Sequence, residues 1–147
     1  MDDSFTYRGM VYPWQCDHMG HMNVMWYVGK FDEACWNLFS RLGLTPSFLR
    51  RGGRGMAAVE QRIRYQRELV AGDVVAVQSV VTELRDKAIV VEQTLFNAEH
   101  GWAAATMSLT GVHLDTAVRK AVAFPPEIAS RIRGHLARPP IAAAFQL

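Results

Sequence analysis

Residues 16–23 concentrate the side chains of this chain that are best suited to acid–base or nucleophilic chemistry. They include a carboxylate, two imidazoles, a glycine and an amide: Asp17, His18, Gly20, His21 and Asn23. A carboxylate can attack an electrophilic carbonyl carbon directly, or it can deprotonate a water molecule that does so. His21 and Asn23 could orient the acid or the water, and Gly20 lets the backbone approach a substrate closely.

The element that must position this segment is a long helix that begins at Val24. Apolar residues follow the three-and-four spacing of one buried helical face: Val24, Tyr27, Val28, Phe31, Ala34, Cys35, Leu38 and Leu42. Four polar side chains fall on the opposite face, which we expect to be solvated: Lys30, Glu33, Asn37 and Arg41. Asn23 is a good N-cap and Gly43 a good terminator. Asp17 therefore lies one short loop from a helix N-terminus, whose free N–H groups can stabilise developing negative charge.

The remaining chain predicts one short strand before the helix and four longer strands after it. The first lies within 5–14, interrupted by Gly9 and closed by Pro13. A helical turn follows Thr45, and the arginine- and glycine-rich stretch 50–55 predicts a loop. Period-two runs or β-rich composition then mark four strands: 57–65, 74–84, 88–96 and 102–114.

The links between these strands predict an α+β fold. A turn at 71–73 and the segments 85–87 and 97–101 are short, and connections that short join antiparallel neighbours. Pro125 and Pro126 favour the start of a short C-terminal helix. We therefore expect a five-stranded antiparallel sheet that curves around one long central helix.

Composition limits the classes of function. The chain has 147 residues, half of them hydrophobic, which suits a single domain over 1–147. A net charge of +2 gives no general attraction to nucleic acid. The N-terminus has no signal-peptide pattern and no apolar run spans a bilayer, so we expect a cytoplasmic protein that is not bound to membranes. Cys16 and Cys35 do not form a disulfide framework.

Two segments and the order of the elements resemble hot-dog fold acyl-CoA thioesterases of the 4-hydroxybenzoyl-CoA thioesterase family. The first segment is residues 17–23, followed by Tyr27 and by Phe31-Asp32-Glu33-Ala34. The second is the stretch from Tyr65 to Gly72-Asp73, which is similar to the family's tyrosine and Gly-Asp turn. The resemblance extends to about Ala123.

The resemblance implies hydrolysis of a small or medium acyl-CoA, at a site between the subunits of a homodimer or homotetramer. Asp17 matches the catalytic carboxylate, as nucleophile or general base, and the backbone N–H of Val24 matches the oxyanion donor. We expect His21 and Asn23 to assist catalysis, and Gly20, His18 and Tyr27 to contact the substrate. No metal or other cofactor is implied beyond the CoA of the substrate.

Two clusters of cationic residues could bind the CoA phosphates, because arginine makes forked contacts with phosphate. One cluster is Arg50, Arg51 and Arg54. The other is Arg119 and Lys120, and the sequence does not choose between them.

Other kinds of site fit less well. A zinc site at 16–21 lacks a second ligand cluster, because His100, His113 and His135 have no paired metal-ligand spacing. Ser40 and Ser47 lie in no nucleophile-elbow context.

Two alternatives to a thioesterase remain open: a hot-dog module that binds acyl-CoA without turnover, and a hot-dog dehydratase, which needs a differently placed His and acid pair. The aromatic residues also allow two readings. Core or interface packing is one, and a box for a quaternary ammonium acyl group is the other: Trp14, Trp26, Tyr27 and Trp36.

Overall fold

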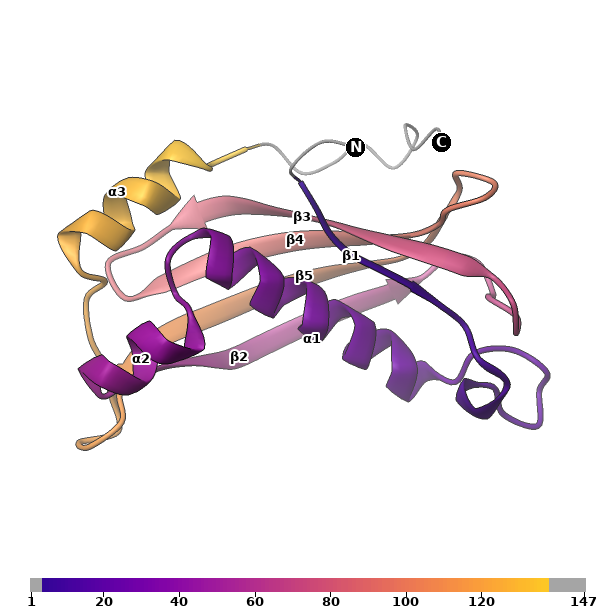
Figure 1. Cartoon of the computed structure of the whole chain (residues 1–147), viewed down its shortest axis with the longest axis horizontal. Helices are drawn as coiled ribbons and strands as arrows, with labels where there is room; N and C mark the ends of the chain where they lie inside the picture. Colours follow the sequence, from indigo (N-terminus) through magenta and orange to yellow (C-terminus); the bar gives the residue numbers. More distant parts are fainter. Residues whose placement is uncertain (1–3, 138–147) are drawn as a thin grey trace.

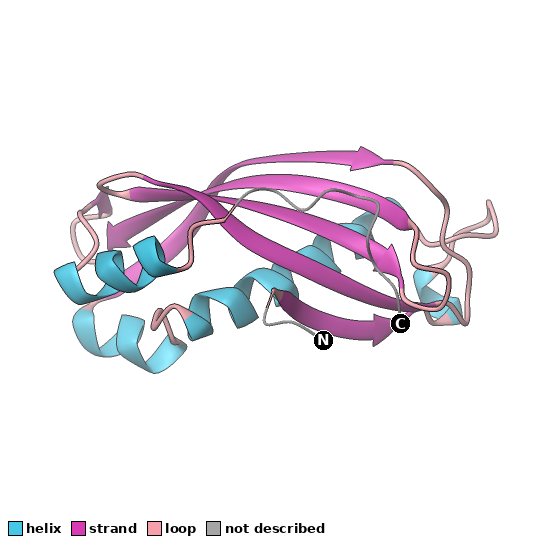
Figure 2. Cartoon of the chain, turned by 90° about the horizontal axis from the view of Figure 1, so that it is seen from above, coloured by secondary structure: helices cyan, strands magenta, loops and turns pink. Residues whose placement is uncertain are grey.

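An antiparallel sheet curves around one long helix in the computed structural model, which describes residues 4–137 (Figure 1). In chain order the elements are β1 (Phe5–Met10), η1 (Pro13–Gln15), α1 (Val24–Arg41), α2 (Pro46–Gly52), β2 (Arg54–Tyr65), β3 (Val74–Leu84), β4 (Ala88–Asn97), β5 (Ala103–Asp115), β6 (Lys120–Ala121) and α3 (Pro126–Gly134). Figure 2 shows α1 lying along one side of the curved strands. This arrangement confirms the predicted hot-dog fold, with β6 as a two-residue addition that was not predicted.

The strand order in the sheet is β1-β3-β4-β5-β2, with every pair antiparallel and β6 paired to β5. The short links from β3 to β4 and from β4 to β5 join neighbours, as predicted. The same expectation was wrong for the turn at 71–73, because β2 pairs with β5 and not with β3. Residues 66–73 therefore cross from one edge of the sheet to its other side, and this crossing passes the N-terminal end of α1.

The core lies between α1 and the sheet. Phe31, Ala34 and Leu38 of α1 are buried in one cluster with residues of the central strands, including Val91 and Leu95. Burial of a leucine or phenylalanine side chain contributes about 1.5–3 kcal/mol. This packing fixes the position of α1, and with it the position of the loop before the helix.

On the face of α1 that was predicted to be solvated, Glu33, Asn37 and Arg41 are exposed, but Lys30 is buried against β1. Lys30 Nζ donates to Met10 O at 3.2 Å, and Asn37 Nδ2 donates to Thr6 O at 2.6 Å. Arg41 Nη2 donates to the carbonyl of the first β1 residue at 3.0 Å. The prediction was therefore wrong for Lys30 and confirmed for the other three. Lys30 is buried because β1 is an edge strand, and its carbonyls accept from donors on this helix face.

The N-terminal half of the predicted apolar face is also different. Val24 and Val28 are 56% and 37% exposed, although both were predicted to be buried. No element among residues 4–137 covers them. The helix therefore presents apolar side chains to the outside beside the loop 16–23.

Two local predictions were corrected, one at the far end of α1 and one in β1. Thr45 Oγ1 accepts from Phe48 N at 3.2 Å and begins α2, as expected, but α2 continues through Arg50 and Arg51 into the predicted loop. Gly53, with φ of +62°, ends the helix, and Arg54 already belongs to β2. At the start of the chain, β1 runs through Gly9, which pairs with Val75.

The C-terminal helix lies where the prolines predicted it, as α3. Among the described residues, no helix has both the length and the hydrophobicity that crossing a bilayer requires.

Candidate active site

Residues 16–23 form a tight turn that is closed by its own backbone. Asp17 N donates to His21 O at 3.2 Å, and Gly20 N donates to Asp17 O at 3.0 Å. Gly20 has φ of +86°, a left-handed conformation that glycine adopts without steric cost. The turn therefore depends on the glycine that the sequence analysis singled out.

Both carboxylate oxygens of Asp17 accept hydrogen bonds. Oδ1 accepts from Met19 N at 2.9 Å, and Oδ2 accepts from Asn23 Nδ2 at 2.7 Å. The Asn23 amide, followed by the Met19 N–H, lowers the pKa of the Asp17 carboxyl below its usual value. Asp17 is therefore a carboxylate at neutral pH, and each oxygen keeps a lone pair for a new contact.

The first turn of α1 leaves one N–H group unused. Asn23 Oδ1 accepts from Met25 N at 3.0 Å, which confirms Asn23 as the N-cap, and Asn23 O accepts from Trp26 N at 3.0 Å. Within residues 4–137 the N–H of Val24 has no acceptor. A helix N-terminus attracts negative charge, so this N–H can donate to an oxyanion.

A groove of about 760 Å³ opens at this end of α1. It is lined by the loop, the start of the helix and the end of β2: His21, Met22, Val24, Tyr27, Tyr65, Gln66, Arg67 and Glu68. The crossing segment holds these parts together, because Met22 N donates to Leu69 O at 2.7 Å. Asp17 is not part of this lining, and it is joined to it by the backbone bond to His21.

The groove combines aromatic rings with charged groups. The rings of Tyr27 and Tyr65 meet edge to face, with their centroids 5.1 Å apart. Burial raises the pKa of the Tyr27 hydroxyl to about 12, so Tyr27 is a neutral phenol. Glu68 Oε1 lies 3.4 Å from His21 Nε2. The Arg67 guanidinium lies 4.5 Å over the ring of Trp102.

The structure brings together only some of the predicted site residues. His21, Val24 and Tyr27 line the groove, and Asn23 bonds to Asp17. His18 and Gly20 are exposed on the turn and do not line it.

The arginines that were predicted to bind phosphate lie at the other end of α1 from the groove. Arg50 and Arg51 are exposed on α2, beyond the C-terminal end of α1 (Figure 1). The helix has 18 residues, and a rise of 1.5 Å per residue makes it about 27 Å long. Arg54 is paired with Asp115, with Nη1 and Oδ2 at 2.7 Å.

The second basic cluster lies at the same end as the first. Thr116 bonds through its backbone N and its hydroxyl to Gly53 O, at 3.0 and 2.9 Å. Arg119 and Lys120, both exposed, follow this contact by a few residues. The two clusters that the sequence presented as alternatives are thus neighbours in the fold.

Tyr65, Arg67 and Glu68 were not among the predicted site residues. Their segment resembles the family's tyrosine and Gly-Asp turn, but nothing in its pattern placed it against residues about forty positions earlier in the chain. The crossing from β2 to β3 produces this contact.

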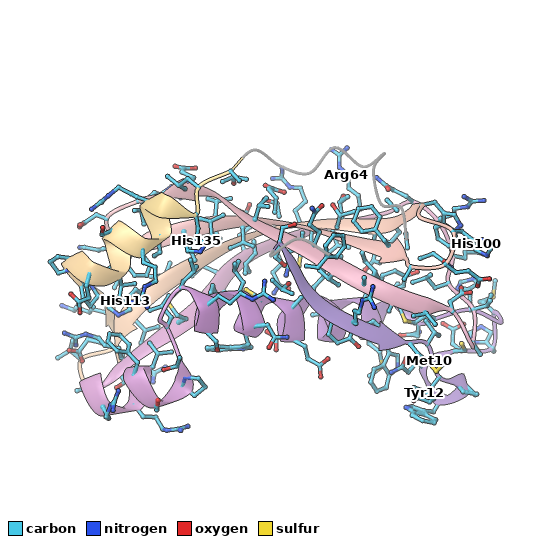
Figure 3. All side chains as sticks on the ribbon, turned by 45° about the horizontal axis from the view of Figure 1, so that its top comes forward. Met10, Tyr12, Arg64, His100, His113 and His135 are labelled. Carbon is cyan, nitrogen blue, oxygen red and sulfur yellow. The ribbon has the colours of Figure 1, made fainter. Side chains whose placement is uncertain are left out.

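The other histidines do not line the groove. His113 and His135 are near α3, and His100 is in the turn between β4 and β5, at the same end of the sheet as the groove (Figure 3). No three His, Cys, Asp or Glu side chains within 4–137 are grouped to hold a metal ion.

Comparison with known protein families identifies the class. Residues 11–132 match the family model of the thioesterase-like superfamily. The chain belongs to this superfamily, which confirms the resemblance in the sequence.

Two relatives carry more specific names. An L-carnitine dehydrogenase/betainyl-CoA thioesterase of Agrobacterium fabrum is 30% identical over 112 residues, which is 76% of this chain and 23% of that protein. A protein of the same name from Rhizobium sp. is 26% identical over 117 residues, 80% of this chain and 23% of that protein. The chain thus spans about a quarter of the length of these relatives.

Solved structures confirm the fold. A Staphylococcus aureus protein, solved in complex with CoA, superposes with a TM-score of 0.86 at 22% identity. The match covers 96% of this chain and 89% of that one.

Proposed function

We propose that this protein hydrolyses the thioester of an acyl-CoA to the free acid and CoA. The observation that carries the proposal is the pairing of an ionised Asp17, held by Asn23, with the unused N–H of Val24 at a helix N-terminus. Membership of the thioesterase-like superfamily supports the same reaction class.

Two routes fit this arrangement. In the first, an Asp17 oxygen attacks the thioester carbonyl carbon, CoA leaves as the thiolate, and water then hydrolyses the mixed anhydride. In the second, Asp17 takes a proton from a water molecule, which attacks the same carbon, and the thiolate leaves. Both give one carboxylic acid and one CoA, and the Val24 N–H donates to the tetrahedral oxyanion in both. In other enzymes, removing one such donor costs about 3 kcal/mol.

Betainyl-CoA is the first acyl-CoA to try as substrate. Both relatives named above are called betainyl-CoA thioesterases. Its acyl group is small, within the small-to-medium range that we expect for this protein.

We propose a homodimer or homotetramer in which a second subunit completes the site. One edge of β2 has no partner strand within residues 4–137, and Val24, Val28, Val59 and Tyr65 expose apolar surface beside it. A second subunit could bring its own Arg50, Arg51, Arg119 and Lys120 toward the CoA phosphates. We further propose a cytoplasmic location, where acyl-CoA esters are available.

The test is thiol release from a panel of acyl-CoA esters, with betainyl, acetyl, medium-chain and aromatic acyl groups. The proposal predicts turnover of at least one ester by the wild type. Binding of esters without any turnover would contradict it and would favour a ligand-binding module.

A further inference from the structure

We infer that the groove contains a cation-binding subsite, formed by Glu68, Tyr65 and Tyr27, that selects acyl groups bearing a quaternary ammonium. The inference rests on the proposed thioesterase function and adds to it the chemical class of the acyl group and the residues that recognise it.

The reach of the substrate places such a subsite next to the oxyanion donor. In a trimethylammonio-acetyl thioester the nitrogen is two bonds from the carbonyl carbon. If the carbonyl oxygen accepts from Val24 N–H, the cation must therefore lie in the immediate surroundings of Val24. The groove that Val24 lines also contains Tyr27, Tyr65 and Glu68.

These side chains suit a cation that has no N–H donors. A trimethylammonium group makes no hydrogen bonds, so it is recognised by ring faces and by opposite charge. Tyr65 is 51% exposed, so part of its ring is open to a ligand, while the buried Tyr27 ring holds it edge to face. Glu68 supplies a carboxylate, whose Oε1 lies 3.4 Å from His21 Nε2.

The cationic side chain of Arg67, which also lines the groove, contacts a different aromatic ring. Arg67 lies over the ring of Trp102, so its guanidinium already has an aromatic partner. An arginine at this position suits the anionic CoA part of the substrate, whereas Glu68 suits a cationic acyl group. Arg67 and Glu68 can thus attract opposite ends of one ligand, the anionic CoA and the cationic acyl group.

A pair of matched substrates isolates the positive charge. Betainyl-CoA and 3,3-dimethylbutanoyl-CoA have acyl groups of the same shape, with nitrogen in one and carbon in the other. We expect the wild type to hydrolyse the cationic ester with a kcat/KM about tenfold or more above that of the neutral one. Glu68→Gln and Tyr65→Leu should each reduce this ratio by about threefold or more, and Tyr65→Phe, which keeps the ring, should retain it.

The control is Glu99→Gln. Glu99 is 70% exposed and lies 3.7 Å from His100, much as Glu68 is 74% exposed beside His21, but it lies outside the groove. This variant should keep the wild-type ratio. Thermal unfolding of every variant shows whether a change in the ratio is accompanied by a loss of folding.

The outcomes separate the two claims. A wild-type ratio near one, or a ratio unaffected by both Glu68→Gln and Tyr65→Leu, would overturn the cation subsite and leave the thioesterase function in place. Failure to hydrolyse either ester, together with turnover of other acyl-CoA esters, would also overturn the subsite alone. No turnover of any ester would overturn the proposed function.

Discussion

Asn23 connects the two groups that we assign to the chemistry. Its Nδ2 donates to Asp17 and its Oδ1 accepts from Met25 N, so one side chain orients the carboxylate and caps the helix. The cap occupies the Met25 N–H and leaves the Val24 N–H for the oxyanion role that we propose. The geometry of the site therefore depends on a residue that need not touch the reacting atoms.

Replacing Asn23 with serine separates these two tasks. Serine is a good N-cap, but its short side chain has no amide to donate to Asp17. Loss of this donor removes a bond to the ionised form, so the pKa of Asp17 should rise toward about 3.9. An NMR titration of the Asp17 carboxyl in wild type and Asn23→Ser measures the shift.

The free energy of unfolding, measured for Asn23→Ser and for Asn23→Ala, gives the control. A lowered pKa contributes stability above the unfolded-state value, and this contribution is lost as the pH falls through the lower folded-state value. Asn23→Ser should thus unfold close to wild type at acid pH, while Asn23→Ala, which also loses the cap, should lose about 1 kcal/mol. An unchanged Asp17 pKa in the serine variant would contradict the assigned bond.

At the scale of residues, the sequence predicted the contacts between residues that are close together in the chain. The helix cap at Asn23 and the turn at Gly20 follow from local rules of backbone geometry. The contact of Glu68 with His21 does not, because it depends on where β2 ends relative to the loop. The sequence pattern does not predict contacts between residues that are so far apart in the chain.

At the scale of elements, the contact between α1 and β1 was not predicted, and it buries Lys30. A polar helix face usually indicates solvent, but here it supplies donors to the carbonyls of an edge strand. Burial lowers the pKa of Lys30, as expected for an amine enclosed between a helix and a strand. The side chains alone could not reveal this, because solvated and strand-bound polar faces have the same periodicity.

Asn37→Ala tests this contact. The change removes the donor to Thr6 O and leaves that carbonyl without this partner, so we expect the free energy of unfolding to fall by about 1 kcal/mol. Ser40→Ala, at an exposed position of the same helix, is the control for helix propensity and should be neutral or slightly stabilising. Urea denaturation of both variants measures the difference, and equal stabilities would argue against a structural role for Asn37.

At the scale of the whole molecule, several exposed apolar side chains lie near the open edge of β2. Val59 on β2 is 62% exposed, and Val24 and Val28 of α1 are also uncovered. Unpaired strand edges and apolar patches are commonly covered by another chain. The fold class was predictable because the helix and the strands have strong apolar periodicities. The position of this open edge was not predictable, because it depends on the strand order, which the periodicities do not determine.

We expect Val59→Glu to weaken self-association, because it places a charge at the proposed interface. Val74→Glu, at a position that is 45% exposed on β3, on the other side of the sheet from β2, is the control and should associate like the wild type. Sedimentation equilibrium at micromolar concentration should give at least twice the 16.5 kDa chain mass for wild type and control. A wild-type monomer would contradict the proposed assembly.

The central claim is that the Asp17 carboxylate performs the hydrolysis, and Asp17→Asn tests it most directly. The amide has the shape of the carboxylate but is neither a competent nucleophile nor a base. Asp86→Asn, in the exposed link between β3 and β4, is the matched control. On the best acyl-CoA ester, we predict that thiol release by Asp17→Asn falls by a factor of about 100 or more in kcat, consistent with the loss of a catalytic acid–base group, while Asp86→Asn keeps wild-type rates. Turnover by Asp17→Asn at the wild-type rate would contradict the account.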